Sequence, residues 1–176
     1  MLALSRFEEA EKYFQDAVRL NISGGHIVGQ AENLAGLSLA LLMRSRVSDA
    51  QRVIESAIAL QETATDADQL TVLARVLMAR ANFEQAEIIL SRGLSLHEAT
   101  ENISGQAYDL LYLAHIAFLR GDPKSARDLM SQASSKSYQH EIFQAEFMMI
   151  RARIPDPAIK PDERAEWLKT ASIIFF

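Results

Sequence analysis

Histidines are the side chains of this chain with the widest catalytic and metal-binding range, and they are spread along the sequence. They are His26, His97, His115 and His140, and no two have the four-residue spacing that places two histidines on one helix face around zinc. The chain has no cysteine, so it offers no disulfide, no thiolate nucleophile and no cysteine ligand for a metal. We therefore expect no metal site and no redox chemistry through its own side chains.

Other patterns with chemical potential have simpler interpretations. Gly24-Gly25 lacks the Gly-Lys-Ser/Thr that completes a phosphate-binding loop, and we interpret it as a turn between helices. Glu8-Glu9 belongs to a charged helix face, whereas acid–base catalysis needs a carboxylate shielded from solvent. Serine is frequent, but the strand-to-helix elbow of hydrolases has no place in an all-helical chain. The sequence therefore predicts neither an enzyme nor a bound cofactor.

Composition limits the partners that this chain can have. Its 176 residues, 49% of them hydrophobic, suffice for one domain or a short repeat array. Lys and Arg number 18 against 23 Asp and Glu, a net charge of −5, and nucleic-acid binding usually needs a basic face. The longest mainly apolar run, Leu34 to Met43, is far shorter than the roughly 20 residues of a membrane helix. Charges interrupt the segment from Met1 to Lys12, which is unlike an export signal. We expect a soluble, cytoplasmic protein that binds neither nucleic acid nor membrane.

An internal repeat organises the chain. The segment Phe7–Ala17 recurs at Val47–Ala57, Phe83–Gly93 and Pro123–Ala133. Each copy has two small residues seven positions apart, about two helical turns, so both lie on one face of a helix. These small residues are Ala10 and Ala17, Ala50 and Ala57, Ala86 and Gly93, and Ala126 and Ala133. The pattern predicts helices that approach a neighbour closely at the small residues.

A second helix with its own register precedes three of these copies. Its shared positions are Leu34, Leu70 and Leu110, then Leu37, Leu73 and Leu113, then the small residues Ser38, Ala74 and Ala114. Arginine follows in the last turn of each, where a cation complements the helix dipole, at Arg44, Arg80 and Arg120. Short turns at Ser45-Arg46, Ala81-Asn82 and Gly121-Asp122-Pro123 join the two helices. Each repeat is therefore predicted to be a helix pair.

These registers resemble the tetratricopeptide repeat (TPR) family, whose consensus alternates large and small residues in this order. The matching residues are Leu34, Leu37, Ser38, Leu41, Ala50, Ile54 and Ala57 in one copy, with equivalents from Leu70 to Gly93 and from Leu110 to Ala133. The family's tryptophan position holds leucine, its terminal proline is missing, and the period exceeds the standard 34 residues. The chain is in this respect similar to the longer-helix repeats found in the sensor arms of ATP-dependent bacterial transcriptional activators and in some adaptor scaffolds, and the repeats alone do not choose between these two. The resemblance implies an all-α fold, a right-handed superhelix of antiparallel helix pairs with about nine helices.

Together the repeats are predicted to form one TPR-like domain over residues 1–176. We expect a partial repeat at 1–20, with its second helix from about Phe7 and only the last turn of its first helix before a turn that precedes Phe7. Full repeats are expected at 28–62, 66–98 and 104–136, and a degenerate repeat at 139–176. The last repeat comprises helices at Glu141–Arg153 and Asp162–Phe176, with Arg164 at the first small position. Its apolar end, Ile173-Ile174-Phe175-Phe176, indicates a fragment of a longer array or a homodimer formed through terminal repeats. The alternative is that these residues fold back onto the last helix pair.

The family resemblance also implies where a ligand binds, because the first helices of TPR pairs line a concave surface. The predicted binding residues in this chain are Leu39, Thr71, Arg75, Tyr108, Leu111, Tyr112 and His115. Arg75 and His115 occupy equivalent places in successive repeats and could hold one anionic group together. The simpler interpretation is that Arg75 is a solvated cation and His115 lies at the edge of the core.

Two functions remain open from the sequence. The first is a non-catalytic module that recognises a protein or a peptide through its concave face. The second is a ligand-sensing and oligomerisation arm of a signal-dependent transcriptional regulator, in which a small effector binds the same face. A small metabolite should raise the thermal stability of a sensor arm, whereas a scaffold should respond only to protein.

Overall fold

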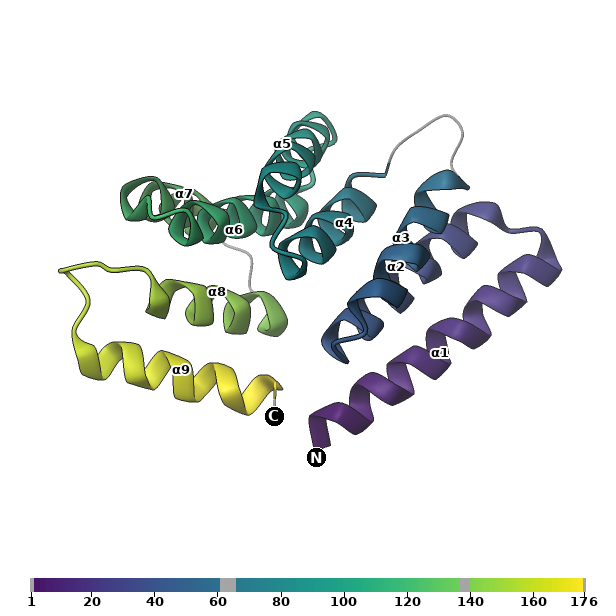
Figure 1. The fold of residues 1–176 in the computed structure, drawn as a ribbon, viewed down its shortest axis with the longest axis horizontal. Helices are drawn as coiled ribbons and strands as arrows, with labels where there is room; N and C mark the ends of the chain where they lie inside the picture. The colour runs from purple at the N-terminus through teal and green to yellow at the C-terminus, as the bar shows by residue number, and fades with distance from the viewer. Residues whose placement is uncertain (1, 61–65, 137–139, 176) are drawn as a thin grey trace. The chain divides into compact units, whose positions relative to one another are not determined.

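The computed structural model describes residues 2–60, 66–136 and 140–175, with the backbone alone for 2–5 and 173–175 (Figure 1). Over these residues the chain is helical without any strand. The helices are α1 (Leu2–Gly24), α2 (Ile27–Met43), α3 (Val47–Ala59), α4 (Ala67–Ala79), α5 (Phe83–Ala99), α6 (Ile103–Leu119), α7 (Pro123–Ser135), α8 (Glu141–Arg153) and α9 (Pro161–Phe175). The predicted all-α fold with about nine helices is confirmed. The chain forms two compact units, residues 1–89 and 90–176, and the boundary falls within α5.

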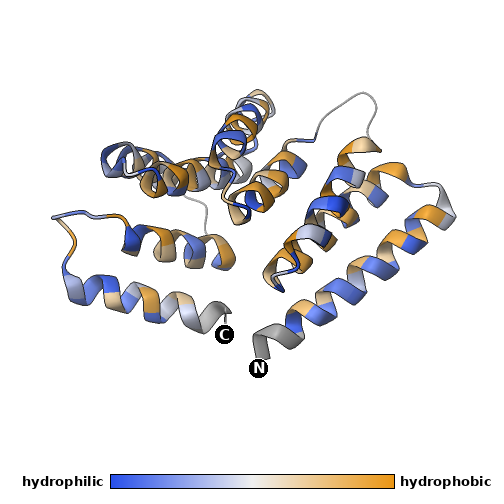
Figure 2. Ribbon diagram, viewed as in Figure 1, coloured by the Kyte–Doolittle hydropathy of each residue, from blue (hydrophilic) through white to orange (hydrophobic). Residues whose placement is uncertain are grey.

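In the first unit consecutive helices pack against each other, α1 on α2, α2 on α3 and α3 on α4. Small residues allow the close approach. A Cβ added to Gly36 of α2 would lie 2.4 Å from the ring of Phe14 on α1. Ser38 of α2 is fully buried and donates a 2.8 Å hydrogen bond to the carbonyl of Ala50 on α3. Figure 2 shows the mixture of apolar and polar residues along each helix that such one-sided burial requires.

In the second unit α7 packs on α6, α9 packs on α8, and α8 also contacts α6. The core between them includes Leu111, Met130 and Phe143. The small residues that the sequence predicts at helix crossings are completely buried in three copies of the repeat: Ala50, Ala57, Ala86, Ala126 and Ala133. In the first copy Ala10 and Ala17 are only half-buried, because α1 packs mainly against α2. The packing register is therefore as predicted in three copies and incomplete in the first.

The same turn closes the first helix of three pairs, α2, α4 and α6, and it also follows α1 at Gly25 and α5 at Glu101. Arg44, Arg80 and Arg120 are the C-cap residues of α2, α4 and α6, one position beyond the last helical turn. The next residue, Ser45, Ala81 or Gly121, has a left-handed backbone with φ of 60°, 58° and 81° respectively. The amide after it then bonds the carbonyl five residues back, at 2.9 Å in all three turns. The turn inside these three helix pairs therefore has one backbone geometry, which the turns after α1 and α5 share.

Ala81 holds this left-handed conformation although a side chain disfavours it, whereas Gly121 adopts it freely. Replacing Ala81 with Gly should therefore raise the free energy of unfolding by up to about 1 kcal/mol. The matched variant Gly121→Ala should lower it by a similar amount. Urea unfolding followed by circular dichroism measures both changes, and a loss of stability in Ala81→Gly would contradict the assigned turn.

The start of the chain differs from the prediction. The sequence predicts a turn before Phe7, but α1 is one continuous helix from Leu2 to Gly24. Ser5-Arg6 repeats the Ser45-Arg46 of the next turn, yet the segment before Phe7 contains no Gly or Pro and its residues are compatible with a helix. The turn expected at Gly24-Gly25 follows directly on α1, since Gly24 is its last residue and Gly25 has a left-handed backbone.

The end of the chain follows the prediction closely in its backbone. Helix α8 has the predicted bounds, and α9 begins at Pro161, a residue suited to the first helical turn. Arg164, at the position of a small residue, is half-buried and donates a 2.7 Å hydrogen bond to the carbonyl of Asp156. The side chains of residues 173–176 lie outside the described part of the structure, so self-association through them stays a prediction.

Candidate functional site

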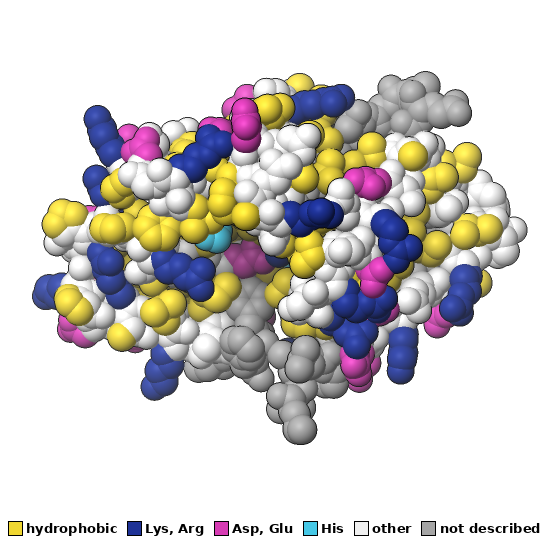
Figure 3. Space-filling view, viewed as in Figure 1, with side chains coloured by type: hydrophobic (Ala, Val, Ile, Leu, Met, Phe, Trp, Pro, Cys, Tyr) yellow, Lys and Arg dark blue, Asp and Glu magenta, His cyan; other side chains and the backbone are white. Residues whose placement is uncertain are grey.

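An ion-pair network joins α1 to the turn between α2 and α3. Glu11, which is almost fully buried, accepts hydrogen bonds from Arg44 and from Arg46, the latter at 2.8 Å. Asp49 bonds Arg46 and Arg52, and the bond from Arg52 contributes most to lowering the pKa of that carboxyl. These arginines have acidic partners within the fold, and we interpret the network as structural. Figure 3 shows charged side chains of both signs distributed over one face of the molecule.

The predicted binding residues of the first unit differ in what they can offer a ligand. Leu39 is half-buried and packs against the core of α2 and α3. Thr71 is nearly buried, and its hydroxyl donates a 3.2 Å hydrogen bond to the carbonyl of Ala67 one turn earlier. Arg75 is half-buried on α4. Leu39 and Arg75 therefore keep exposed surface, whereas Thr71 contributes mainly to its own helix.

Three predicted binding residues of the second unit are involved in packing between α6 and α8. Leu111 is completely buried in the core. Tyr112 is 5% exposed, and its hydroxyl bonds the carboxylate of the buried Glu146 on α8. Tyr108 stacks on Tyr112 with ring centroids 6.2 Å apart and meets Phe143 edge-on at 5.1 Å. Leu111 and Tyr112 are thus inaccessible to a ligand, because α8 and the core cover them, and Tyr108 retains partial exposure.

His115 stands two helical turns beyond Tyr108 and is half-buried. Burial lowers the pKa of its imidazole, and repulsion from the guanidinium of Arg153 lowers this pKa further. Lowering the pKa favours the neutral imidazole, which can serve a ligand as a hydrogen-bonding ring. Arg75 belongs to the first unit and His115 to the second. Binding of one anion by both side chains therefore stays a prediction.

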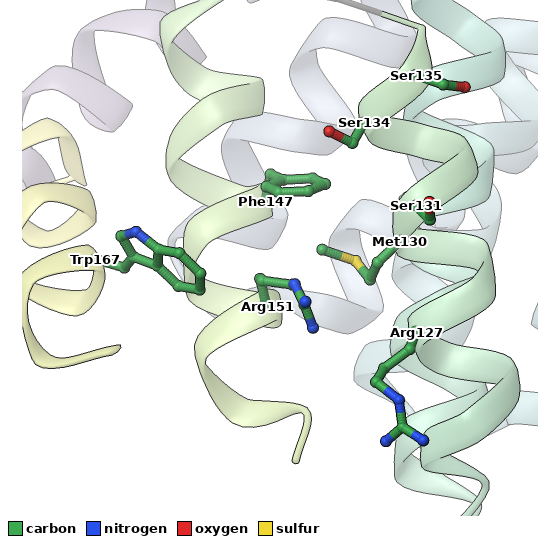
Figure 4. Close-up of a pocket in the computed structure, with 8 residues that line it drawn as sticks. All are labelled: Arg127, Met130, Ser131, Ser134, Ser135, Phe147, Arg151 and Trp167. Carbon is green, nitrogen blue, oxygen red and sulfur yellow. The ribbon is translucent and has the colours of Figure 1, made fainter. Parts of the chain in front are cut away.

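A pocket of about 440 Å³ lies between α7, α8 and α9 (Figure 4). Its walls combine basic, hydroxyl and aromatic side chains. In Figure 4 the guanidinium of Arg151 extends from α8 toward Met130, while Phe147 and Trp167 present their rings from α8 and α9. The lining residues are Arg127, Met130, Ser131, Ser134, Ser135, Phe147, Arg151 and Trp167. This pocket lies entirely within the second unit.

Backbone and side-chain contacts hold the two arginines of the pocket in place. Arg127 donates a 2.7 Å hydrogen bond to the carbonyl of Pro155, in the segment between α8 and α9. Arg151 Nη2 pairs with Asp156 at 2.5 Å, and this bond is the main reason why the pKa of Asp156 is lowered. The other terminal nitrogen, Arg151 Nη1, is buried and has no hydrogen-bond partner among the described residues. Buried donors in this state are uncommon and costly in native proteins.

None of the residues that line this pocket was among the predicted binding residues. A signal is present in the sequence, because Arg127, Ser131 and Ser134 repeat at helical spacing along one stripe of α7. Phe147 and Arg151 are likewise one turn apart on α8. Polar stripes of this kind usually face solvent, so spacing alone does not distinguish a pocket wall from an open surface.

The fold places this chain in the class of all-helical proteins in which helices that follow one another along the chain pack together. No model of a known protein family matches the chain, and no curated protein is significantly similar to it. In the described part of the chain, no three His, Asp or Glu side chains gather as a metal site requires. No helix in that part is long and apolar enough to span a membrane.

Proposed function

We propose that this chain is a non-catalytic helical-repeat module, similar to TPR proteins, that recognises a protein or a peptide with the inner faces of its first helices. The observation that carries this proposal is a helix–turn–helix pair present in three copies. In each copy the equivalent turn position, Ser45, Ala81 or Gly121, has a left-handed backbone. In helical-repeat proteins, equivalent positions of successive repeats contribute to one binding surface, which suits extended protein ligands better than chemistry on a substrate.

The accessible members of the predicted site are the ones that support recognition. Leu39, Arg75, Tyr108 and His115 are all half-buried, so each combines a fixed base with some exposed surface. Aromatic and arginine side chains held in this way are frequent anchors in protein interfaces. Leu111 and Tyr112 would contribute only indirectly, because Tyr108 packs against the core that contains Leu111 and stacks on the ring of Tyr112.

Site-specific photocrosslinking in the native host tests this proposal. A photoreactive amino acid at Leu39, Tyr108 or His115 should capture the same partner protein. Matched probes at the exposed Glu55 and Asp128, on the second helices α3 and α7, should not capture it. Equal capture from both sets, or capture from the second helices alone, would contradict recognition by the first helices. Arg75→Ala combined with His115→Ala should weaken the captured complex.

The alternative proposal is a ligand-sensing arm of a transcriptional regulator. The observation that favours it is the pocket of the second unit, whose basic and aromatic lining suits a small molecule (Figure 4). A sensor arm should change its oligomeric state when the effector binds. Light scattering with and without a stabilising small molecule separates this function from protein recognition.

A further inference from the structure

The pocket between α7, α8 and α9 places a basic group beside an apolar surface. Arg127 and Arg151 supply two guanidinium groups, and Ser131 and Ser134 add hydroxyls along α7. Phe147, Trp167 and Met130 form the apolar part of the lining. The lining is thus at least as polar as it is apolar, and in small-molecule sites polar groups of this kind fix the orientation of a ligand while the apolar groups hold its body.

The charges around the pocket favour a ligand with a negative charge. Arg127 and Arg151 line it, and the carboxylate of Asp156 pairs with Arg151 at 2.5 Å. Arg164 adds a third guanidinium group at Asp156, because it donates a 2.7 Å hydrogen bond to the carbonyl of that residue, so the cations outnumber this carboxylate. Arginine also matches the planar shape of a carboxylate with paired N–H donors.

Arg151 Nη1 supplies the second argument for an anion. This nitrogen is buried without a hydrogen-bond partner among the described residues, although it belongs to a charged group. Leaving such a donor unsatisfied has a cost comparable to that of a lost hydrogen bond, and the cost is larger for charged groups. Arg151 also lines the pocket, so a rotation of its guanidinium group would bring Nη1 to a carboxylate oxygen of a bound ligand.

The aromatic walls define the rest of the ligand. Trp167 and Phe147 present rings from two different helices, and the thioether of Met130 lies across from them (Figure 4). Aromatic rings prefer offset or edge-on contact with other rings, and methionine sulfur packs well against them. A volume of about 440 Å³ falls in the range of small-molecule sites.

We propose that this pocket binds a carboxylate attached to an aromatic group. The ligand is either a free aromatic acid or the C-terminal aromatic residue of a peptide, which share this chemistry. Arg151 and Arg127 hold the carboxylate, and Trp167 and Phe147 hold the ring. The proposal does not depend on recognition by the first helices, because none of the predicted binding residues lines this pocket.

Fluorescence tests the proposal directly, because Trp167 is the single tryptophan of the chain. Phenylacetate represents the free acid, N-acetylphenylalanine the peptide end, and N-acetylphenylalanine amide the same group without its charge. At least one acid should change the Trp167 emission in a saturable way and bind about tenfold or more tightly than the amide. The acid that binds more tightly identifies the source of the ligand. The absence of saturation with both acids, or equal binding of the amide, would overturn the proposal.

Variants then separate the carboxylate contact from general effects of charge. Arg151→Gln should weaken binding of the preferred acid by about tenfold or more, and Arg127→Gln should weaken it by a smaller factor. Lys124→Gln is the matched control, since it removes an exposed cation of α7 that does not line the pocket. Circular dichroism checks that each variant is folded. If Arg151→Gln were unfolded, Arg127→Gln would decide, and unchanged affinity in a folded arginine variant would contradict the assigned contact.

Discussion

Replacing Asp109 with Ala should lower the free energy of unfolding by about 3 kcal/mol. Asp109 of α6 and His97 of α5 are buried, and a 2.7 Å hydrogen bond joins Asp109 Oδ2 to His97 Nδ1. Removing the carboxylate deprives the buried imidazole of this bond and leaves a void where the side chain was. Urea unfolding of the whole chain, followed by circular dichroism, measures the loss.

The surroundings of this pair show how closely the fold accommodates it. A Cβ added to Gly105 would lie 2.4 Å from the His97 ring, and one added to Gly93 would lie 3.1 Å from Asp109 Oδ2. Gln106 donates a 3.1 Å hydrogen bond to the carbonyl of His97 and accepts one of 2.7 Å from Lys136. Residues from α5, α6 and the end of α7 thus meet at one polar cluster within the core of the second unit.

Two further variants make the Asp109 prediction specific. Asp109→Asn keeps the shape and one acceptor oxygen, so its loss should be smaller than that of Asp109→Ala. Asp128→Ala removes an exposed carboxylate from α7 and should change stability by no more than about 0.5 kcal/mol. If Asp109→Ala and Asp128→Ala lost the same amount, the buried pair would contribute nothing to stability.

Much of the fold follows from residues that the sequence shows directly. The small residues Ala50, Ala86 and Ala126 recur in register, and each is completely buried in the structure. Proline predicts the start of α7 at Pro123 and marks the start of α9 at Pro161. These features are predictable because periodicity and proline act locally, over one or two helical turns.

Features that depend on contacts between distant residues were not predictable in the same way. Ser5-Arg6 and Ser45-Arg46 are identical dipeptides, yet the first lies inside α1 and the second forms a turn. The turn requires a left-handed backbone at Ser45, and local sequence does not decide whether the rest of the chain compensates its cost. The second dipeptide joins two helices, α2 and α3, that pack against each other.

The candidate sites show the same limit. The sequence presents His97 as an isolated histidine, because its partner Asp109 is twelve residues away on another helix. Periodicity assigns Tyr112 to the first helix of its pair, but its burial depends on α8, which begins far along the chain. The pocket likewise needs three helices to form, so neither its volume nor the environment of Arg151 is encoded in any one segment.

Replacing Phe143 with Ala should have the largest effect, a loss of about 3–5 kcal/mol in the free energy of unfolding. Phe143 of α8 is 2% exposed and belongs to the core that α6 and α7 also form. Its ring meets Tyr108 edge-on at 5.1 Å and lies 5.9 Å from the ring of Phe147. Truncation removes both aromatic contacts and leaves a cavity that the surrounding helices can close only in part.

The neighbouring residue provides the control for this variant. Ile142 is 46% exposed on the same turn of α8, so Ile142→Ala should cost far less than Phe143→Ala. A face of α8 that packs on α6 requires this difference, because one-residue steps on a helix point to different sides. If both substitutions lost the same stability, the contact between α8 and α6 would be wrong, and the burial of Tyr112 and Glu146 would have no basis.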